Sequence, residues 1–288
     1  MARRSHSSRR RKRAFLTVAA ALFLAAAYLW WGNRTLQVTQ FEASFADLPH
    51  GFDGCRVAVI SDLHGAKFGE ENEALLAAIA AQQPEYIFYL GDLEDRFRGQ
   101  EVGYAAKIAA GLSASAPTYY VTGNHEWAIG GVPALKETLE ANGVTVLSNE
   151  YVTLERNGDP IILAGIDDPN GYADQKTPET LAAEIYAAEG DPFWLLLAHR
   201  NNRFANQYSL LSADLVLSGH GHGGFWRLPG TDGLVGHEYN FFPSYMAGFY
   251  EENGSLLFVT RGLGNSGWTF RVANRPEIAI LTLHTKAG

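Results

Sequence analysis

Cysteine is almost absent from the sequence: Cys55 is the only one in 288 residues. A single thiol excludes an intramolecular disulfide and a zinc site built from several cysteines. The GxxxxGK[ST] loop that binds phosphate is missing, and no Ser/His/Asp order or cysteine nucleophile is apparent. The missing nucleophile motifs favour a reaction that forms no covalent enzyme intermediate. Because Cys55 opens an apolar run, we expect it to be a buried structural thiol.

Basic residues are scarce outside the first 31 positions. Seven of the 23 lysines and arginines lie there, without one acidic residue, and the remaining 16 are outnumbered by 31 acidic residues. The body therefore carries a net charge of −15, which repels polyanions and argues against nucleic-acid binding. A small phosphoryl substrate stays compatible with this charge, because bound divalent ions dominate the field at a metal site.

The sequence has one long uncharged run, residues 14–31. As a helix it would span about 27 Å, near the lower limit for crossing a bilayer. Tyr28, Trp30 and Trp31 at its end are typical of a membrane interface. A cleaved signal peptide, with a small-residue site at 25–27, is an alternative. We favour an uncleaved single-pass anchor, because an aromatic belt directly after a cleavage site would serve no purpose.

The basic residues before this run predict its orientation. By the positive-inside rule, residues 1–13 form a cytoplasmic tail, and the body lies on the other side of the membrane. No internal repeat, low-complexity linker or composition break follows residue 34. We therefore expect three parts: the tail 1–13, the anchor or signal segment 14–31, and one extracytoplasmic domain, 34–288.

From residue 55 the chain alternates short apolar runs with helical segments. After a first edge strand in 34–54, we expect strands at 57–60, 86–90 and 118–121, each followed by a helix, near 70–81, 102–112 and 132–141. This alternation predicts an α/β domain with a largely parallel central sheet. Closely spaced strands at 144–147, 151–154 and 161–164 predict antiparallel pairing at an edge or in a second sheet. A helix at 178–188 and strands at 193–198, 215–218, 256–260 and 277–283 complete the prediction.

Polar side chains follow five of these predicted strands. They are Asp62 with His64, then Asp92, then Asn124 with His125 and Glu126, then His199, and last His220 with His222 in a glycine-rich turn. Ligands gather at the carboxyl ends of strands in open α/β sheets, so we expect these side chains to meet at one edge. Each segment alone would more often be a cap, a turn or a surface histidine. Together they hold five of the nine histidines, which packing does not explain.

In their order and spacing, the five segments resemble the calcineurin-like metallophosphoesterase family, whose pattern is D-x-H, G-D, G-N-H-[DE], H and G-H-x-H. The resemblance covers roughly residues 34–288, and the part from Tyr245 through Arg261 to Glu277 is similar to a membrane-anchored bacterial branch. It implies a four-layer α/β/β/α sandwich and a place at the bacterial inner (cytoplasmic) membrane.

The resemblance also implies a role for each matched residue. One metal ion would be held by Asp62, His64, Asp92 and His222, and a second by Asp92, Asn124, His199 and His220, with Asp92 bridging. His125 would lie near the scissile phosphate, and Glu126 would orient it. Mixed carboxylate, amide and imidazole ligands suit manganese, iron or zinc better than magnesium or calcium. Two such divalent ions can share a hydroxide that attacks phosphorus, while His125 protonates the leaving oxygen or stabilises charge.

We therefore expect hydrolysis of a phosphodiester or pyrophosphate bond on a small or lipid-linked phosphoryl substrate, because an anchor raises the effective concentration of a membrane-borne substrate. The resemblance suggests UDP-diacylglucosamine as a candidate, but the outward orientation opposes it because that nucleotide is cytoplasmic. The alternatives are a phosphomonoesterase or phosphoprotein phosphatase, and an anchored metal-binding scaffold without turnover. Arg200 and Arg203 follow His199 and are candidate phosphate contacts, with a solvated loop as the alternative.

Overall fold

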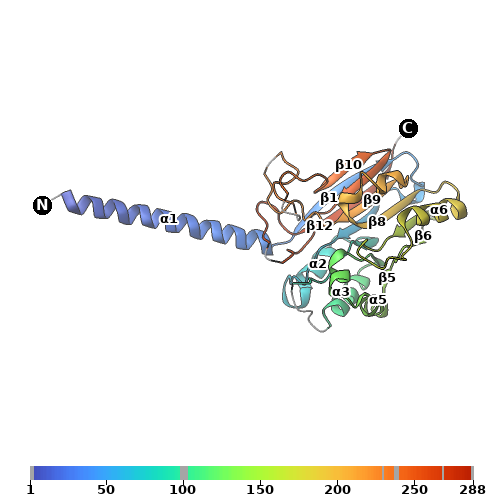
Figure 1. Cartoon of the computed structure of the whole chain (residues 1–288), viewed down its shortest axis with the longest axis horizontal. Coiled ribbons are helices and arrows are strands. Elements are labelled where there is room, and N and C mark those ends of the chain that lie inside the picture. Colours follow the sequence, from blue (N-terminus) through green and yellow to red (C-terminus); the bar gives the residue numbers. More distant parts are fainter. Residues whose placement is uncertain (1–2, 98–102, 229, 237–239, 268, 287–288) are drawn as a thin grey trace.

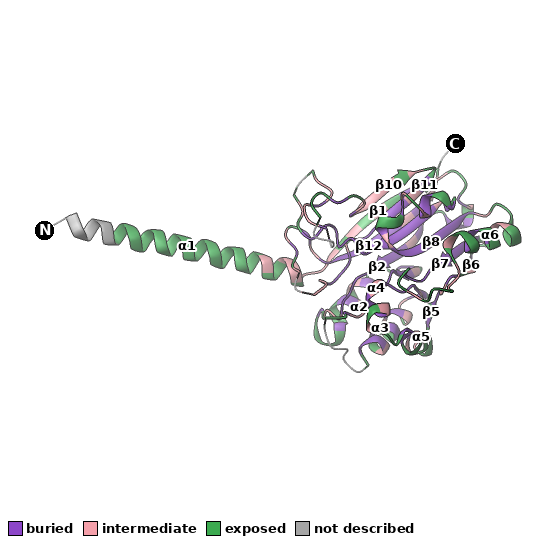
Figure 2. Cartoon of the chain, viewed as in Figure 1, coloured by how far each residue is buried: buried purple, intermediate pink, exposed green. Residues whose placement is uncertain are grey.

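Helix α1, Arg3–Arg34, projects from the body of the protein (Figure 1). The structure is a computed structural model that describes residues 3–97, 103–228, 230–236, 240–267 and 269–286. From Arg9 to Arg34 the helix is long and apolar enough to cross a membrane, and most of this stretch is exposed (Figure 2). The predicted apolar helix is present, but it is longer than 14–31 and includes much of the basic tail.

The first sheet has six strands in the order β1-β12-β2-β3-β4-β5. Their bounds are β1 Gln37–Phe45, β2 Cys55–Ile60, β3 Tyr86–Tyr89, β4 Thr118–Tyr120, β5 Val144–Val146 and β12 Glu277–Thr285. Strands β2 to β5 are parallel, β1 is parallel to β12, and β12 is antiparallel to β2. The predicted parallel centre is confirmed. The antiparallel pairing expected for 144–147 is wrong, because β5 follows a helix and extends the parallel set.

The second sheet also has six strands, in the order β10-β11-β9-β8-β7-β6. Their bounds are β6 Glu150–Arg156, β7 Asp159–Gly165, β8 Trp194–Arg200, β9 Leu215–Gly219, β10 Gly248–Glu252 and β11 Ser255–Val259. The hairpins β6–β7 and β10–β11 are antiparallel, whereas β7, β8, β9 and β11 are parallel. β10 has no distinct apolar run, and the sequence did not predict it.

Helices cover the outer faces of both sheets, which gives four layers. α2 (Glu73–Ala80), α3 (Tyr104–Ser113) and α5 (Val132–Ala141) pack on the first sheet, and α6 (Pro178–Glu189) packs on the second. Between the sheets lies a core that includes Val59, Leu163 and Phe258. The expected α/β/β/α sandwich is confirmed. The shorter elements are α4 Asn124–Ile129 and the 3-10 turns His50–Phe52, Glu70–Asn72, Asn201–Arg203 and Tyr208–Leu210.

Helix α1 joins the domain at the edge of the sheet where the parallel strands end. β1 begins at Gln37, which pairs with Glu277 at the start of β12. β12 is antiparallel to β2, with Ala279 opposite Val59, so the start of β12 lies beside the end of β2. Only two residues separate α1 from β1. The helix therefore leaves the domain next to the loop that follows β2.

Cys55 lies in the core between the sheets, as the sequence predicts, and is 1% exposed. Burial raises the pKa of its thiol to about 12. The thiolate is the reactive form of cysteine, so this residue is inert at neutral pH.

The core between the sheets makes a first prediction possible. We expect Leu163→Ala in β7 to lower the free energy of unfolding by roughly 2–5 kcal/mol, because the change leaves a cavity at a fully buried position. Leu210→Ala is the matched control: Leu210 is 64% exposed, and its loss should change stability by less than about 0.5 kcal/mol. Urea unfolding of the detergent-solubilised chain measures both, and equal effects would contradict the assigned core.

Candidate metal centre

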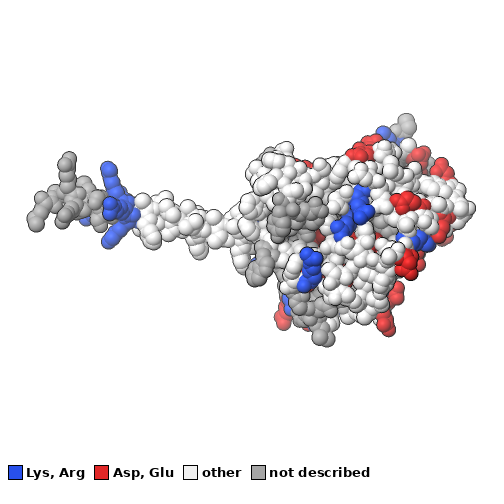
Figure 3. Space-filling view, in the orientation of Figure 1, with Lys and Arg blue, Asp and Glu red and all other residues white. Residues whose placement is uncertain are grey.

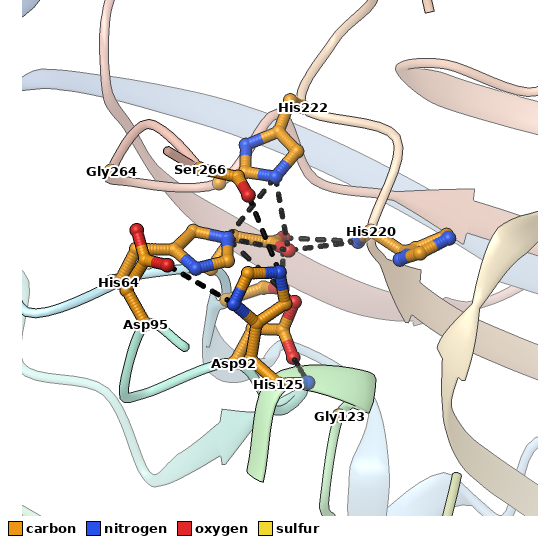
Figure 4. A network of polar contacts seen from close by, with 12 residues as sticks. His64, Asp92, Asp95, Gly123, His125, His220, His222, Gly264 and Ser266 are labelled. Carbon is orange, nitrogen blue, oxygen red and sulfur yellow. Dashed lines mark hydrogen bonds and ion pairs between the residues drawn. The ribbon is translucent and has the colours of Figure 1, made fainter. Parts of the chain in front are cut away.

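The loops after five strands bring the predicted ligands together at one edge of the two sheets. Asp62 and His64 follow β2, Asp92 follows β3, Asn124 begins α4 after β4, His199 lies near the end of β8, and His220 and His222 follow β9. Asn124 is partly exposed and the other six are buried. Figure 4 shows the rings of His64, His125 and His222 directed at one small volume beside Asp92. The structure thus groups all seven predicted metal ligands.

The first donor group consists of Asp62, His64 and His222. The Nε2 atoms of His64 and His222 are 3.2 Å apart, and Asp62 Oδ1 lies 3.9 and 3.6 Å from them. Two ligands that each lie about 2.1 Å from one ion are about 3.0 Å apart at a right angle and about 3.4 Å apart at the tetrahedral angle. The separation of the two nitrogens therefore fits two neighbouring ligands of a single ion.

The second donor group consists of Asp92, His199 and His220. His199 Nε2 lies 3.1 Å from His220 Nδ1, 3.2 Å from Asn124 Oδ1 and 3.3 Å from Asp92 Oδ2. His199 Nδ1 lies 2.6 Å from the carbonyl oxygen of Leu90, which can only accept a hydrogen bond. The proton of neutral His199 is therefore on Nδ1, which leaves the lone pair of Nε2 for a metal ion.

Asp92 connects the two groups. Its Oδ2 lies 3.3 Å from His199 Nε2 and 3.7 Å from His64 Nε2, so one oxygen is within reach of both groups. Its Oδ1 accepts a hydrogen bond from the backbone nitrogen of His125 at 2.9 Å. This arrangement suits a carboxylate that bridges two cations.

The electrostatics of the cluster favour cation binding. Burial lowers the pKa of His199, but the carboxylate of Asp92 outweighs it and raises the pKa to about 10. For Asp62, burial and the charge of Asp92 raise the pKa to about 6, despite the opposing effect of His199. Burial lowers the pKa of His64 to about 4. The carboxylates thus need positive charge nearby, and a divalent ion can supply it in place of the proton on His199, which is then released.

Five of the ligand residues have a left-handed backbone. The φ angles lie between 49° and 64° at Asp62, His64, Asp92, His220 and His222. Such angles are uncommon in residues other than glycine, although Asp and His tolerate them better than most, and they concentrate at functional sites. These residues lie in the turns where the chain leaves β2, β3 and β9.

Two glycines allow the loops to approach this closely. A Cβ on Gly123 would lie against Asp92 Oδ1 and 2.6 Å from the Asp92 backbone nitrogen, and a Cβ on Gly219 would lie 2.7 Å from Asp62 Oδ2. Real Cβ contacts are essentially never this short. Any side chain at either position would therefore displace a ligand carboxylate.

The carboxylate beside His125 is that of Asp95 rather than that of Glu126. His125 Nδ1 lies 3.3 Å from Asp95 Oδ1, and Asp95 Oδ2 accepts a hydrogen bond from Gly267 N. The same Nδ1 accepts a hydrogen bond from Arg96 N at 3.1 Å. Burial lowers the pKa of His125, but the close contact with the Asp95 carboxylate and the charge of Asp92 leave it above the usual value. The sequence analysis missed Asp95, whose one signal is its position three residues after Asp92.

Glu126 stabilises the loops instead. Its Oε2 accepts hydrogen bonds from Asp92 N at 3.0 Å and Gly123 N at 2.7 Å, and its Oε1 accepts one from Glu94 N at 3.2 Å. The side chain thus fixes the backbone that presents Asp92 and starts α4, and the role predicted for Glu126 in orienting His125 stays a prediction.

Arg271 is a second residue that the sequence analysis missed. It is 1% exposed, and its guanidinium donates hydrogen bonds to the carbonyl oxygens of Arg261 (2.8 Å), Gly264 (2.7 Å) and His222 (3.3 Å). It joins the loop that carries His222 to the loop after β11. Nothing in its sequence context indicates this, because its partners are remote in the chain.

The two arginines predicted to contact phosphate do not line the cavity beside the ligands. Arg200 forms a two-point ion pair with Asp168, at 2.7 and 3.1 Å, and Arg203 is exposed near Gln207. Both line a separate surface cavity. The cavity beside the ligands has a volume of about 380 Å³, and its arginine is Arg96. Its lining residues include His125, Phe225, Ser266 and Thr269.

A profile of the calcineurin-like phosphoesterase family matches residues 55–224, which contain the six residues of the two donor groups and also Asn124. The chain belongs to this family. It is therefore a metal-dependent phosphoesterase, a hydrolase that acts on phosphate esters, and it uses divalent metal ions.

Three relatives show how far the similarity of this phosphoesterase extends. It is 28% identical to the uncharacterized metallophosphoesterase YkuE of Bacillus subtilis (strain 168), over 86% of this chain and 85% of that protein. It is 29% identical to the phosphodiesterase YaeI of Escherichia coli (strain K12), over 79% and 82%. It is also 29% identical to a transmembrane protein with metallophosphoesterase domain from Danio rerio, over 86% of this chain and 57% of that protein.

The pairing of His125 with Asp95 can be tested by a conservative substitution. We expect Asp95→Asn to keep its metal and to lower kcat roughly 10- to 100-fold, because His125 loses the carboxylate that positions it. Without that carboxylate the pKa of His125 falls, so the loss of activity with rising pH should begin at lower pH.

Glu126→Gln is the control for Asp95→Asn. It should reduce thermal stability through the loss of a backbone hydrogen bond, and it should move the pH profile less than Asp95→Asn does, because the charge of Glu126 raises the pKa of His125 less than Asp95 does. If Glu126→Gln moved the alkaline limb and Asp95→Asn did not, the assignment of Asp95 would be wrong.

Proposed function

We propose that this phosphoesterase hydrolyses a phosphodiester or pyrophosphate bond with two divalent metal ions, on a membrane-associated substrate. The observation that carries the proposal is the pair of donor groups that share one oxygen of Asp92. Asp62, His64, Asp92 and His222 would hold one ion, and Asp92, Asn124, His199 and His220 the other. The donor set suits manganese, iron or zinc.

The chain's own residues bind the phosphoryl group and transfer a proton. Divalent ions at such a site supply Lewis-acid activation of water and of phosphoryl oxygens. Arg96 lines the cavity and offers its guanidinium to a phosphoryl oxygen. His125, with its pKa raised through Asp95, holds the proton that the leaving oxygen needs. Asp95 is ionised, because the contact with His125 and the hydrogen bonds from Phe97 N and Gly267 N outweigh burial and lower its pKa to about 2.

The substrate class follows from the similarity to a phosphodiesterase and from the anchor. The relative from Escherichia coli bears the name phosphodiesterase, and α1 is long enough to cross a bilayer. We infer a single-pass protein of a bacterial inner membrane, with residues 1–13 in the cytoplasm and the domain outside. An enzyme held there would meet lipid-linked phosphoryl compounds at high effective concentration.

Metal analysis tests the two-ion site. We expect the purified chain to bind close to two divalent ions, Asp92→Ala to lose both metal and activity, and His125→Ala to keep the metal and lose roughly 10²–10⁴ in rate. Elemental analysis and an assay on the same samples measure this. Fewer than one ion in the parent chain would defeat the two-metal proposal, and full activity in His125→Ala would defeat the role of that histidine.

Paired substrates test the reaction type. We expect higher kcat/KM for bis-nitrophenyl phosphate than for nitrophenyl phosphate, with manganese added, because both release the same leaving group and differ in the ester class. A clear preference for the monoester would replace the phosphodiesterase proposal with a phosphomonoesterase. Arg200→Ala and Arg203→Ala serve as controls that should leave both activities unchanged, since neither side chain lines the cavity.

A further inference from the structure

The metal centre and helix α1 lie at the same edge of the domain. β1 starts beside the start of β12, which lies next to the end of β2, the strand that presents Asp62, and two residues join β1 to α1. A membrane crossed by α1 would therefore lie next to the metal centre and not at the opposite end of the sheets, where the chain terminates (Figure 1).

Contacts with the domain fix the end of the helix. Asn33 Oδ1 accepts hydrogen bonds from Arg271 N at 2.7 Å and Asn265 Nδ2 at 2.9 Å, and Asn33 Nδ2 donates to the carbonyl oxygen of Arg271 at 2.9 Å. The guanidinium of Arg275 lies 4.8 Å from the centre of the Trp31 ring. The helix is therefore not a loose tether, and the same face of the domain stays turned toward the membrane.

Exposed apolar side chains gather on this face. We call Trp226, Leu228, Phe241, Phe242 and Phe270 the interfacial patch; Phe241 and Phe242 are 72% and 67% exposed. The patch is continuous with the helix: the rings of Trp226 and Phe270 are 5.4 Å apart, and Phe270 lines a cavity with Leu29 and Trp30 of α1. Phe241 joins the patch through Val235, which pairs with both Phe241 and Trp226.

Acidic side chains on one face of the domain also lie mainly away from helix α1. On the face shown in Figure 3, acidic side chains gather at the end of the domain far from α1, and the surface next to the helix has few of them. The cavity that Phe270 lines with Leu29 and Trp30 is called the junction cavity here. It has a volume of about 540 Å³ and is also lined by Arg34 and Lys67. A net negative body thus presents to the membrane a surface that suits apolar chains and anionic headgroups.

One segment separates the junction cavity from the cavity beside the metal ligands, which we call the catalytic cavity. Leu263, Gly264, Asn265 and Phe270 line the first cavity, and Ser266, Gly267 and Thr269 line the second. A molecule held in the membrane at the end of α1 is therefore one loop away from His125.

We propose that the interfacial patch rests in the surface of the lipid bilayer, so that the catalytic cavity opens beside the membrane and receives phosphodiesters that are still embedded in it. The occupant of the patch is the bilayer because the patch is continuous with a helix that is itself exposed and apolar over the length of a span. Large exposed aromatic patches of this kind mark interaction surfaces, and Trp and Phe suit the membrane interface. The choice of substrate rests on the proposed function, whereas the membrane contact does not.

Fluorescent labelling tests the membrane contact directly. The one native cysteine is buried, so the full-length variants Phe241→Cys and Leu210→Cys can each be labelled at the new thiol with the environment-sensitive dye NBD. Leu210 is the matched control, because it is an exposed apolar residue on the turn that contacts β11, near Asn253 at the opposite end of the strands. In phosphatidylcholine–phosphatidylglycerol vesicles, NBD at 241 should shift to shorter wavelength and be quenched by doxyl-labelled lipids, whereas NBD at 210 should show neither change.

Two results would overturn the contact. Equal quenching at 241 and 210 would remove the bilayer as the occupant, and a blue shift at 241 without doxyl quenching would identify another protein surface, such as a second copy. Metal content equal to that of the parent shows that each labelled chain is folded, and Phe242→Cys repeats the test if Phe241→Cys does not fold.

Activity measurements test delivery of the substrate. We expect Phe241→Ser with Phe242→Ser to leave hydrolysis of soluble bis-nitrophenyl phosphate unchanged and to lower hydrolysis of a diacylglycerol nitrophenyl phosphate in vesicles roughly tenfold, through KM. Equal activity of parent and variant on the vesicle substrate would overturn delivery from the membrane. A parent chain that hydrolyses neither diester, but whose label at 241 is quenched, would defeat the proposed function and leave the membrane contact standing.

Discussion

The structure depends on the burial of several carboxylates and imidazoles around one oxygen of Asp92. That oxygen lies within 3.3 Å of His199 and 3.7 Å of His64, at a position that is almost fully shielded from water. Buried charge of this density is unfavourable unless it is paired or coordinates a metal ion. The left-handed backbone at five ligand residues adds to the cost. The rest of the fold must therefore hold this cluster in place against its own tendency to separate.

The two sheets supply that restraint by fixing the start of every ligand loop, and a few polar side chains tie the loops to each other. Glu126 joins the loop after β3 to the start of α4. Arg271 joins the loop of His222 to the loop after β11, and its backbone binds Asn33 of α1. One residue thus contacts both the loop of His222 and helix α1. The position of the anchor and the position of His222 are set by the same hydrogen-bonded segment.

Most strands along the chain and the residues that gather at one edge of the sheets could be predicted from the sequence, because both are local patterns: a short apolar run, then Asp, Asn or His in a turn. Asp95 and Arg271 could not, since each acts through a partner that is remote in sequence, such as Gly267 for Asp95 and His222 for Arg271. Arg200 is the converse case. Its place after His199 suggested a phosphate contact, but Asp168, which is equally remote, binds it in an ion pair. Sequence patterns give the donor residues and not the partner that each one finds.

The short connection between α1 and β1 limits which substrates can reach the metal centre. Two extended residues span roughly 7 Å, and the contacts of Asn33 hold the helix end against the domain. With α1 in a membrane, as proposed above, the domain would have little freedom to rise above the bilayer or to turn over. A longer, flexible tether would let the site sample soluble substrates and distant headgroups alike. A short, fixed connection would favour a scissile bond that lies close to the bilayer surface. The position of α1 would then restrict how far from the membrane a scissile bond can be hydrolysed, independently of any contact in the catalytic cavity.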